Sequence, residues 1–250
     1  MAGHSKWANI KHRKAAQDKR KGKIFTRLIR EIMSAARQGG GDPKANPLLR
    51  KTIETARSEN LTADVIERAI KRGTGELKGA DYEEVVFEGY ALGGVAIVIK
   101  CLTDNNTRTV ANVRSYFTKW GGALGTSGSV AWMFDYKGVI YYPASVASED
   151  AMMEAAIEAG AEDVQTEGDT HRITCAPHDF GTVKPALEAK FGKPDAADFE
   201  YLPKQWQPVT DEEMAVKINK LTVALDDDDD VQTVTTNMEL SDTLAAKLHG

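Results

Sequence analysis

The chain has 250 residues, of which 42% are hydrophobic and 28% charged, a composition typical of folded proteins and not of disordered ones. No apolar run approaches the roughly 20 residues of a membrane-spanning helix, and no apolar segment of a secretory signal follows the basic N-terminus. The two cysteines, Cys101 and Cys175, have no metal-type spacing and are too few for a disulfide framework, so we expect buried thiols in the reducing cytoplasm.

The net charge of −5 conceals an uneven distribution along the chain. Residues 1–78 contain nineteen basic and eight acidic side chains, a balance of +11. Residues 79–250 contain thirteen basic and twenty-nine acidic side chains, a balance of −16. This asymmetry predicts a basic head that binds a polyanion and an acidic body that repels phosphate.

The first domain, residues 1–78, is predicted to be all-helical. Apolar residues recur with helical spacing from Ile24 to Ala36. Asn46-Pro47 begins a second helix, with Asn as the N-cap and Pro at the first helical position. A third helix begins after Thr62 and ends at Gly73.

Strand-like segments follow. Residues 84–87 and 95–102 are rich in β-branched residues, and Gly93-Gly94 predicts a turn between them. A helix is expected over 107–120 and another strand over 129–134. Residues 79–131 therefore have the order β-β-α-β.

The middle of the chain has its own alternation of strands and helices. Lys137-Gly138 predicts a turn into a first strand, after which strands and helices alternate. The expected strands are 139–142, 163–165, 172–175 and 199–202, and the expected helices are 149–158 and 179–190.

The C-terminal part adds a helix over 211–225 and a strand over 231–236. Neither this part nor residues 79–131 makes a complete sheet layer alone, so we expect them to form one domain together. The predicted fold is multidomain α+β: a helical domain followed by two ferredoxin-like domains. One of these is split, 79–131 plus 209–250, and the other, 132–208, is inserted in it.

The sequence lacks a catalytic signature. No HExxH or GxSxG motif occurs, and we interpret His171 and His178 as surface histidines near a buried thiol. The glycine-rich stretches 73–79 and 122–128 lack the pattern of phosphate-binding loops and predict turns. The acidic run 226–230 is interpreted as a solvated loop without a metal. We therefore expect no catalytic residue, no cofactor, no metal site and no small-molecule substrate.

The basic N-terminal segment is the candidate binding site, because its lysines and arginines suit phosphate contacts. Trp7 and His12 could stack on unpaired bases, although for Trp7 alone a core anchor is the slightly favoured interpretation. A solvated helical face is the alternative for the whole segment. The predicted nucleic-acid-binding residues are Lys6, Trp7, Lys11, His12, Arg13, Lys14, Lys19, Arg20, Lys21, Lys23, Arg27 and Arg30.

Several motifs resemble the YebC family, whose mitochondrial relatives are translational activators of cytochrome oxidase. The most specific is the opening segment from Ala2 to Lys14, AGHSKWANIKHRK, whose position also argues against a removed presequence. Where the family often has Gly-Pro, this chain has Ala91-Leu92, which puts any role of that loop in doubt. The match continues through 39–43 (GGGDP), Asn46-Pro47, 66–73 (IERAIKRG), 87–90 (FEGY), 102–105 (LTDN), Arg108-Thr109 and 128–130 (GSV).

The resemblance implies three domains, one inserted in another, and a non-enzymatic regulator of gene expression in the cytoplasm. Family members are described as DNA-binding transcriptional regulators or as translation factors that act on stalled ribosomes. Phosphate contacts look alike in both cases, so promoter DNA and rRNA or tRNA both stay open as partners. We favour the ribosome because of Trp7 and His12. An adaptor that binds proteins through the acidic α+β body is a second alternative, and the oligomeric state is left open.

Overall fold

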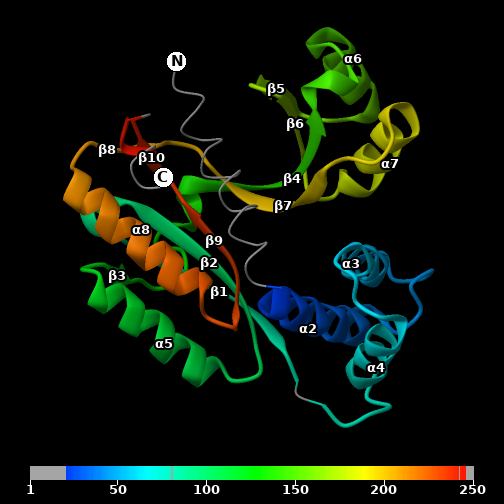
Figure 1. The fold of residues 1–250 in the computed structure, drawn as a ribbon, viewed down its shortest axis with the longest axis horizontal. Coiled ribbons are helices and arrows are strands. Elements are labelled where there is room, and N and C mark those ends of the chain that lie inside the picture. The colour runs from blue at the N-terminus through cyan, green and yellow to red at the C-terminus, as the bar shows by residue number, and fades with distance from the viewer. Residues whose placement is uncertain (1–20, 80, 242, 246–250) are drawn as a thin grey trace. The chain divides into compact units, whose positions relative to one another are not determined.

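The computed structural model describes residues 21–79, 81–241 and 243–245 (Figure 1). Their contacts divide the chain into two compact units. One unit contains the described residues up to Val130 together with Asp211–Thr236, and the other contains Ala131–Thr210 together with the described residues from Asn237 onward.

Three helices open the first unit: α2 (Lys21–Gly39), α3 (Pro47–Ser58) and α4 (Ala63–Gly73). Asn46 caps α3 by accepting a hydrogen bond from the Leu49 amide at 3.0 Å. Its buried side-chain amide also donates to the carbonyls of Ala35 and Gly40, so one asparagine fixes the α2–α3 turn. Gly73 lets α4 approach α2 closely, because a Cβ there would collide with the Met33 carbonyl.

An antiparallel four-stranded sheet completes this unit, in the order β3-β1-β2-β9. Helices α5 and α8 lie side by side against it (Figure 1). Gly93 and Gly94 both have positive φ in the turn η1 (Leu92–Gly94), as expected of a turn built from two glycines. The bounds are β1 (Glu83–Tyr90), β2 (Ala96–Thr103), α5 (Asn106–Lys119), β3 (Ala123–Leu124), α8 (Glu212–Asp226) and β9 (Val231–Thr236).

The strand predicted over 129–134 is wrong. Residues Ala131–Met133 form the 3-10 turn η2, and the next strand, β4, begins only at Phe134. The cause is the buried carboxylate of Glu88, which accepts hydrogen bonds from the amides of Gly128 and Val130 at 2.7 Å each. Those amides are therefore not available for a strand ladder.

The second unit contains another antiparallel sheet, in the order β5-β6-β4-β7, whose core lies between the sheet and helices α6 and α7. The element order β-α-β-β-α-β is that of the ferredoxin-like plan. The bounds are β4 (Phe134–Pro143), η3 (Ala144–Val146), α6 (Glu149–Ala159), β5 (Asp163–Glu167), β6 (Thr170–Cys175), α7 (Phe180–Phe191) and β7 (Ala196–Pro203).

The turn predicted at Lys137-Gly138 is also wrong, since both residues lie inside β4. Packing, and not a turn, explains a glycine at position 138, because a side chain would not fit there. A Cβ at this position would lie 2.5 Å from the Phe180 ring and 2.9 Å from the Cys175 sulfur. The multidomain α+β class predicted from the sequence is confirmed by the helices and the two antiparallel sheets.

The last strands refine the domain boundaries. Strand β8 (Gln207–Val209) pairs in parallel with β10 (Met238–Leu240) in a separate two-stranded sheet. The described residues from Asn237 onward therefore group with the middle segment, whereas all of 209–250 was predicted to belong to the split domain. The helical and split domains also form one compact unit. We keep the three-domain division as a proposal, supported by the pairing of β9 with β2 across the insertion.

Candidate nucleic-acid interface

Eight of the twelve predicted binding residues lie outside the part of the chain that the structure describes. Lys6, Trp7, Lys11, His12, Arg13, Lys14, Lys19 and Arg20 fall outside the described residues. Lys21 and Lys23 lie in the first turn of α2, and their side chains are not described. The side chains of Arg27 and Arg30, about one and two turns further along α2, are described in full.

Arg27 and Arg30 turn towards the acidic loop between α8 and β9. Arg27 Nη2 donates to the Asp226 carbonyl at 2.8 Å and lies 3.5 Å from its carboxylate. Arg30 Nη1 donates to the Asp229 carbonyl at 2.6 Å and to Asp230 Oδ1 at 2.9 Å. The two side chains are only 17% and 14% exposed. These arginines hold α2 against the split domain, so the phosphate role assigned to them from the sequence stays a prediction without support from their contacts.

Asp230 is the centre of this junction, and its burial corrects the interpretation of the acidic run as a solvated loop at this residue, whereas Asp227 and Asp229 are exposed. Its residue exposure is 3%. Besides Arg30, it accepts hydrogen bonds from Arg108 Nη2 at 2.8 Å and from the Thr109 hydroxyl at 2.7 Å. Burial alone would raise the pKa of Asp230, but the hydrogen bonds from Arg108 and Thr109 outweigh it and hold the pKa below the usual aspartate value.

Asp228 gives the same loop a second anchor. It is 8% exposed and accepts hydrogen bonds from Asn112 Nδ2 and from the Tyr116 hydroxyl, both at 3.1 Å. Burial and the Asp228 charge raise the pKa of Tyr116 above its usual value, so its hydroxyl stays protonated and keeps donating. The loop is therefore folded by side chains of α5 and α2, none of which is close to it in sequence.

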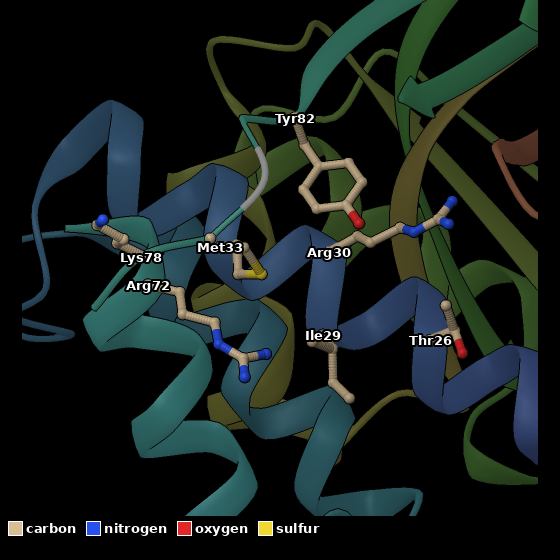
Figure 2. Close-up of a pocket in the computed structure, with 8 residues that line it drawn as sticks. Thr26, Ile29, Arg30, Met33, Arg72, Lys78 and Tyr82 are labelled. Atoms are coloured by element: carbon tan, nitrogen blue, oxygen red, sulfur yellow. The ribbon is translucent and has the colours of Figure 1, made fainter. Parts of the chain in front are cut away.

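A hollow of about 320 Å³ lies between α2, α4 and the segment that follows α4 (Figure 2). Three of its lining residues are basic, and none is acidic. Arg72 and Lys78 are exposed, and within the described part of the chain neither makes an ion pair. The lining consists of Thr26, Ile29, Arg30, Met33, Arg72, Lys78, Gly79 and Tyr82.

Arg72, Lys78 and Tyr82 were missed by the sequence analysis. The two cations lie within the basic head but outside the dense N-terminal cluster, and Tyr82 follows the boundary assigned at residue 78. The motif 66–73, which ends with Lys-Arg-Gly, was used for its resemblance to the family and for the helix end at Gly73, and not as a phosphate-binding signal. The one available signal was the run Lys71-Arg72 followed by a glycine-rich segment and Lys78.

The two thiols and the imidazole of His171 are shielded from solvent. Both cysteines are buried, as predicted. Burial raises the pKa of Cys101, and it raises the pKa of Cys175 to about 11, so neither thiol ionises readily near neutral pH. His171, interpreted above as a surface residue, is 1% exposed and is held by Thr166 and the Ala147 carbonyl. No group of three or more metal-ligating side chains occurs among the described residues.

The geometry defines a multidomain α+β protein whose helical head carries exposed cations, among them Arg72 and Lys78. Residues 5–76 match the family model described as the TACO1/YebC protein N-terminal domain, and residues 82–238 match the TACO1/YebC second and third domain. The chain therefore belongs to the TACO1/YebC family, as the motifs had indicated.

Relatives of this chain are named as regulators. It is 54% identical to a probable transcriptional regulatory protein from Magnetococcus marinus, with 99% of both chains covered. It is 52% identical to another from Idiomarina loihiensis, again over 99% of both chains. The crystal structure of a conserved hypothetical protein from Aquifex aeolicus is similar, with a TM-score of 0.82 and 46% identity over 89% of this chain and 92% of that one. No helix among the described residues is long and apolar enough to cross a membrane.

Proposed function

We propose that the protein is a cytoplasmic, non-enzymatic regulator of gene expression that binds a nucleic acid through its basic helical head. The observation that carries this proposal is the segregation of charge, +11 in residues 1–78 against −16 in the rest. A phosphate backbone is attracted by the first part and repelled by the second, so binding is confined to the head. The names of the relatives, probable transcriptional regulatory proteins, agree with such a role.

The described contacts set Arg27 and Arg30 apart from the other cations predicted to bind phosphate. Arg27 and Arg30 are occupied by the acidic loop. The cations before them in the chain, together with exposed Arg72 and Lys78, are the ones we assign to phosphate. Lysines act as mobile point charges and arginines add forked hydrogen bonds, a combination that suits a backbone contact without base reading.

RNA of the ribosome, rRNA or tRNA, is the target that we favour, with relief of stalled translation as the role. Trp7 and His12 stand among the lysines, and aromatic side chains stack on splayed bases that RNA offers and duplex DNA does not. Promoter DNA is the second candidate, because the relatives carry transcriptional names.

The test is to recover the tagged full chain from lysate, with and without nuclease, and to sequence the bound nucleic acid. The perturbing variant reverses Lys19, Arg20 and Lys21 to Glu. Its matched control reverses Lys190, Lys193 and Lys204, exposed lysines of the second unit, and changes the net charge equally.

We expect ribosomal RNA or tRNA to be enriched with the wild type and the control, and lost with the head variant. Enrichment of specific promoter fragments would assign the protein to transcription instead. Proteins that remain bound after nuclease treatment, with no nucleic acid enriched, would contradict the proposal and support the adaptor alternative.

A further inference from the structure

The hollow of the helical head has the size and lining of a small-ligand site. Its volume of about 320 Å³ lies at the lower end of the range for ligand pockets. Ile29 and Met33 of α2 supply apolar surface, and Figure 2 shows Met33 between Arg72 and Tyr82. The walls therefore combine an apolar floor, an aromatic ring and a guanidinium.

The walls of this hollow are held in place by contacts outside it. The Arg30 guanidinium lies 5.1 Å from the centre of the Tyr82 ring and is itself fixed by Asp230. Tyr82 also packs against the buried core of the three helices. Gly79 lies so close to Arg72 and Met33 that a Cβ there would come within 3.2 Å of each. The hollow is thus formed before any ligand arrives, which lowers the entropic cost of binding.

The charges around the hollow select for an anion. Arg72 and Lys78 are exposed and make no ion pair within the described residues, and no acidic side chain lines the hollow. Arg30 adds a third positive charge beside it, already balanced by the acidic loop. A ligand that fits has a flat, largely apolar ring for the floor and a phosphate for Arg72.

We propose that this hollow binds one unpaired nucleotide of the target strand, with its base between Met33 and Tyr82 and its phosphate at Arg72 and Lys78. The inference rests on the proposed function and adds a requirement for single-stranded nucleic acid at this point. A base inside a duplex is stacked and paired, so it does not enter such a site without being extruded. Stacking of one base on an aromatic side chain contributes about 1–3 kcal/mol, which is roughly a 5- to 150-fold change in affinity.

The experiment measures the affinity of the full chain for a labelled single-stranded RNA and for a duplex DNA of equal length by fluorescence anisotropy. Arg72→Glu is compared with Arg57→Glu, which makes the same charge change at an exposed arginine of α3 that does not line the hollow. Tyr82→Leu removes the ring, and Tyr82→Phe keeps it. Circular dichroism checks that each variant is folded.

We expect Arg72→Glu and Tyr82→Leu to weaken RNA binding at least 5-fold more than their respective controls, Arg57→Glu and Tyr82→Phe. On duplex DNA, each variant should bind with nearly the same affinity as its control. Equal losses for Arg72→Glu and Arg57→Glu would overturn the inference and leave only general electrostatic attraction. If Tyr82→Leu is unfolded, the comparison of Arg72→Glu with Arg57→Glu tests the inference by itself. Failure of the wild type to bind either polymer would instead refute the proposed function itself, so the two failures are distinguishable.

A crosslinking measurement locates the base directly. RNA that carries 4-thiouridine is irradiated in complex with the wild type, and the crosslinked peptides are identified by mass spectrometry. The inference predicts crosslinks to peptides that contain Met33 or Tyr82. Crosslinks confined to the second unit would overturn it.

Discussion

Replacement of Asp230 tests whether the acidic loop holds the helical head on the split domain. The carboxylate is 3% exposed and accepts hydrogen bonds from two arginines and from the hydroxyls of Thr103 and Thr109. Asp230→Ala leaves the Arg30 guanidinium, on a side chain only 14% exposed, without this partner. Removal of one partner from a buried ion pair costs about 3–5 kcal/mol. For a domain of this size, that corresponds to a fall of roughly 6–20 °C in Tm.

The assay is urea unfolding followed by circular dichroism, with hydrogen exchange to locate the effect. Asp227→Asn is the control, since it removes a charge from an exposed side chain of the same loop and surface changes stay within about 0.5 kcal/mol. Exchange should rise in α2, α5 and β9 of Asp230→Ala and stay unchanged in β4–β7. A loss no larger than that of the control would show that the network does not stabilise the fold.

The pH dependence of this contribution follows from the lowered pKa of Asp230. A carboxyl whose pKa is lower in the folded than in the unfolded state adds stability above the unfolded value, about 3.9, and loses it as the pH falls through the folded value. The difference in unfolding free energy between the wild type and Asp230→Asn should therefore be constant above about pH 5 and shrink below about pH 4. A difference that grows on acidification would contradict the sign of this pKa shift.

Three further predictions concern other parts of the chain. A fragment of residues 131–204 should fold cooperatively, because it contains a complete sheet, whereas residues 21–130 alone should not, because they lack α8 and β9; circular dichroism melts of both fragments check this. Gly138→Ala should lower the unfolding free energy by about 1–3 kcal/mol in urea titrations, since its Cβ would crowd Phe180 and Cys175, and an unchanged midpoint would refute the packing argument. Trp7→Ala should weaken RNA binding by about 1–3 kcal/mol and leave duplex DNA binding almost unchanged, and equal losses on both polymers would remove the stacking argument.

Local signals in the sequence were sufficient for the helical head. Helical spacing of apolar residues, the Asn46-Pro47 start and the terminal Gly73 all depend on neighbours within a few positions. Most helices and strands after residue 79 could be predicted for the same reason, and with them the α+β class. The short strands β3, β8 and β10 were not expected.

The features that could not be predicted depend on partners far away in sequence. Gly138 looks like a turn residue until Phe180 is packed against it. The strand expected over 129–134 is displaced by the carboxylate of Glu88, about 40 residues earlier. In the sequence, Asp230 is one of five consecutive aspartates and was interpreted as solvated. Its partners Arg30, 200 residues away in sequence, and Arg108 are brought to it only by the fold. Periodicity and local composition do not predict such contacts between residues that are far apart in the sequence.

The central claim, that the basic head binds a phosphate backbone, is tested most directly by the salt dependence of binding. The equilibrium constant of the full chain for duplex DNA and for single-stranded RNA is measured over a range of salt concentrations. About six phosphate contacts should give a log–log slope near −5 on duplex DNA and about −4 on single strands. Reversal of Lys19, Arg20 and Lys21 to Glu should abolish binding, and reversal of Lys190, Lys193 and Lys204 should not. Binding that is independent of salt, or unchanged by the reversal in the head, would contradict the account.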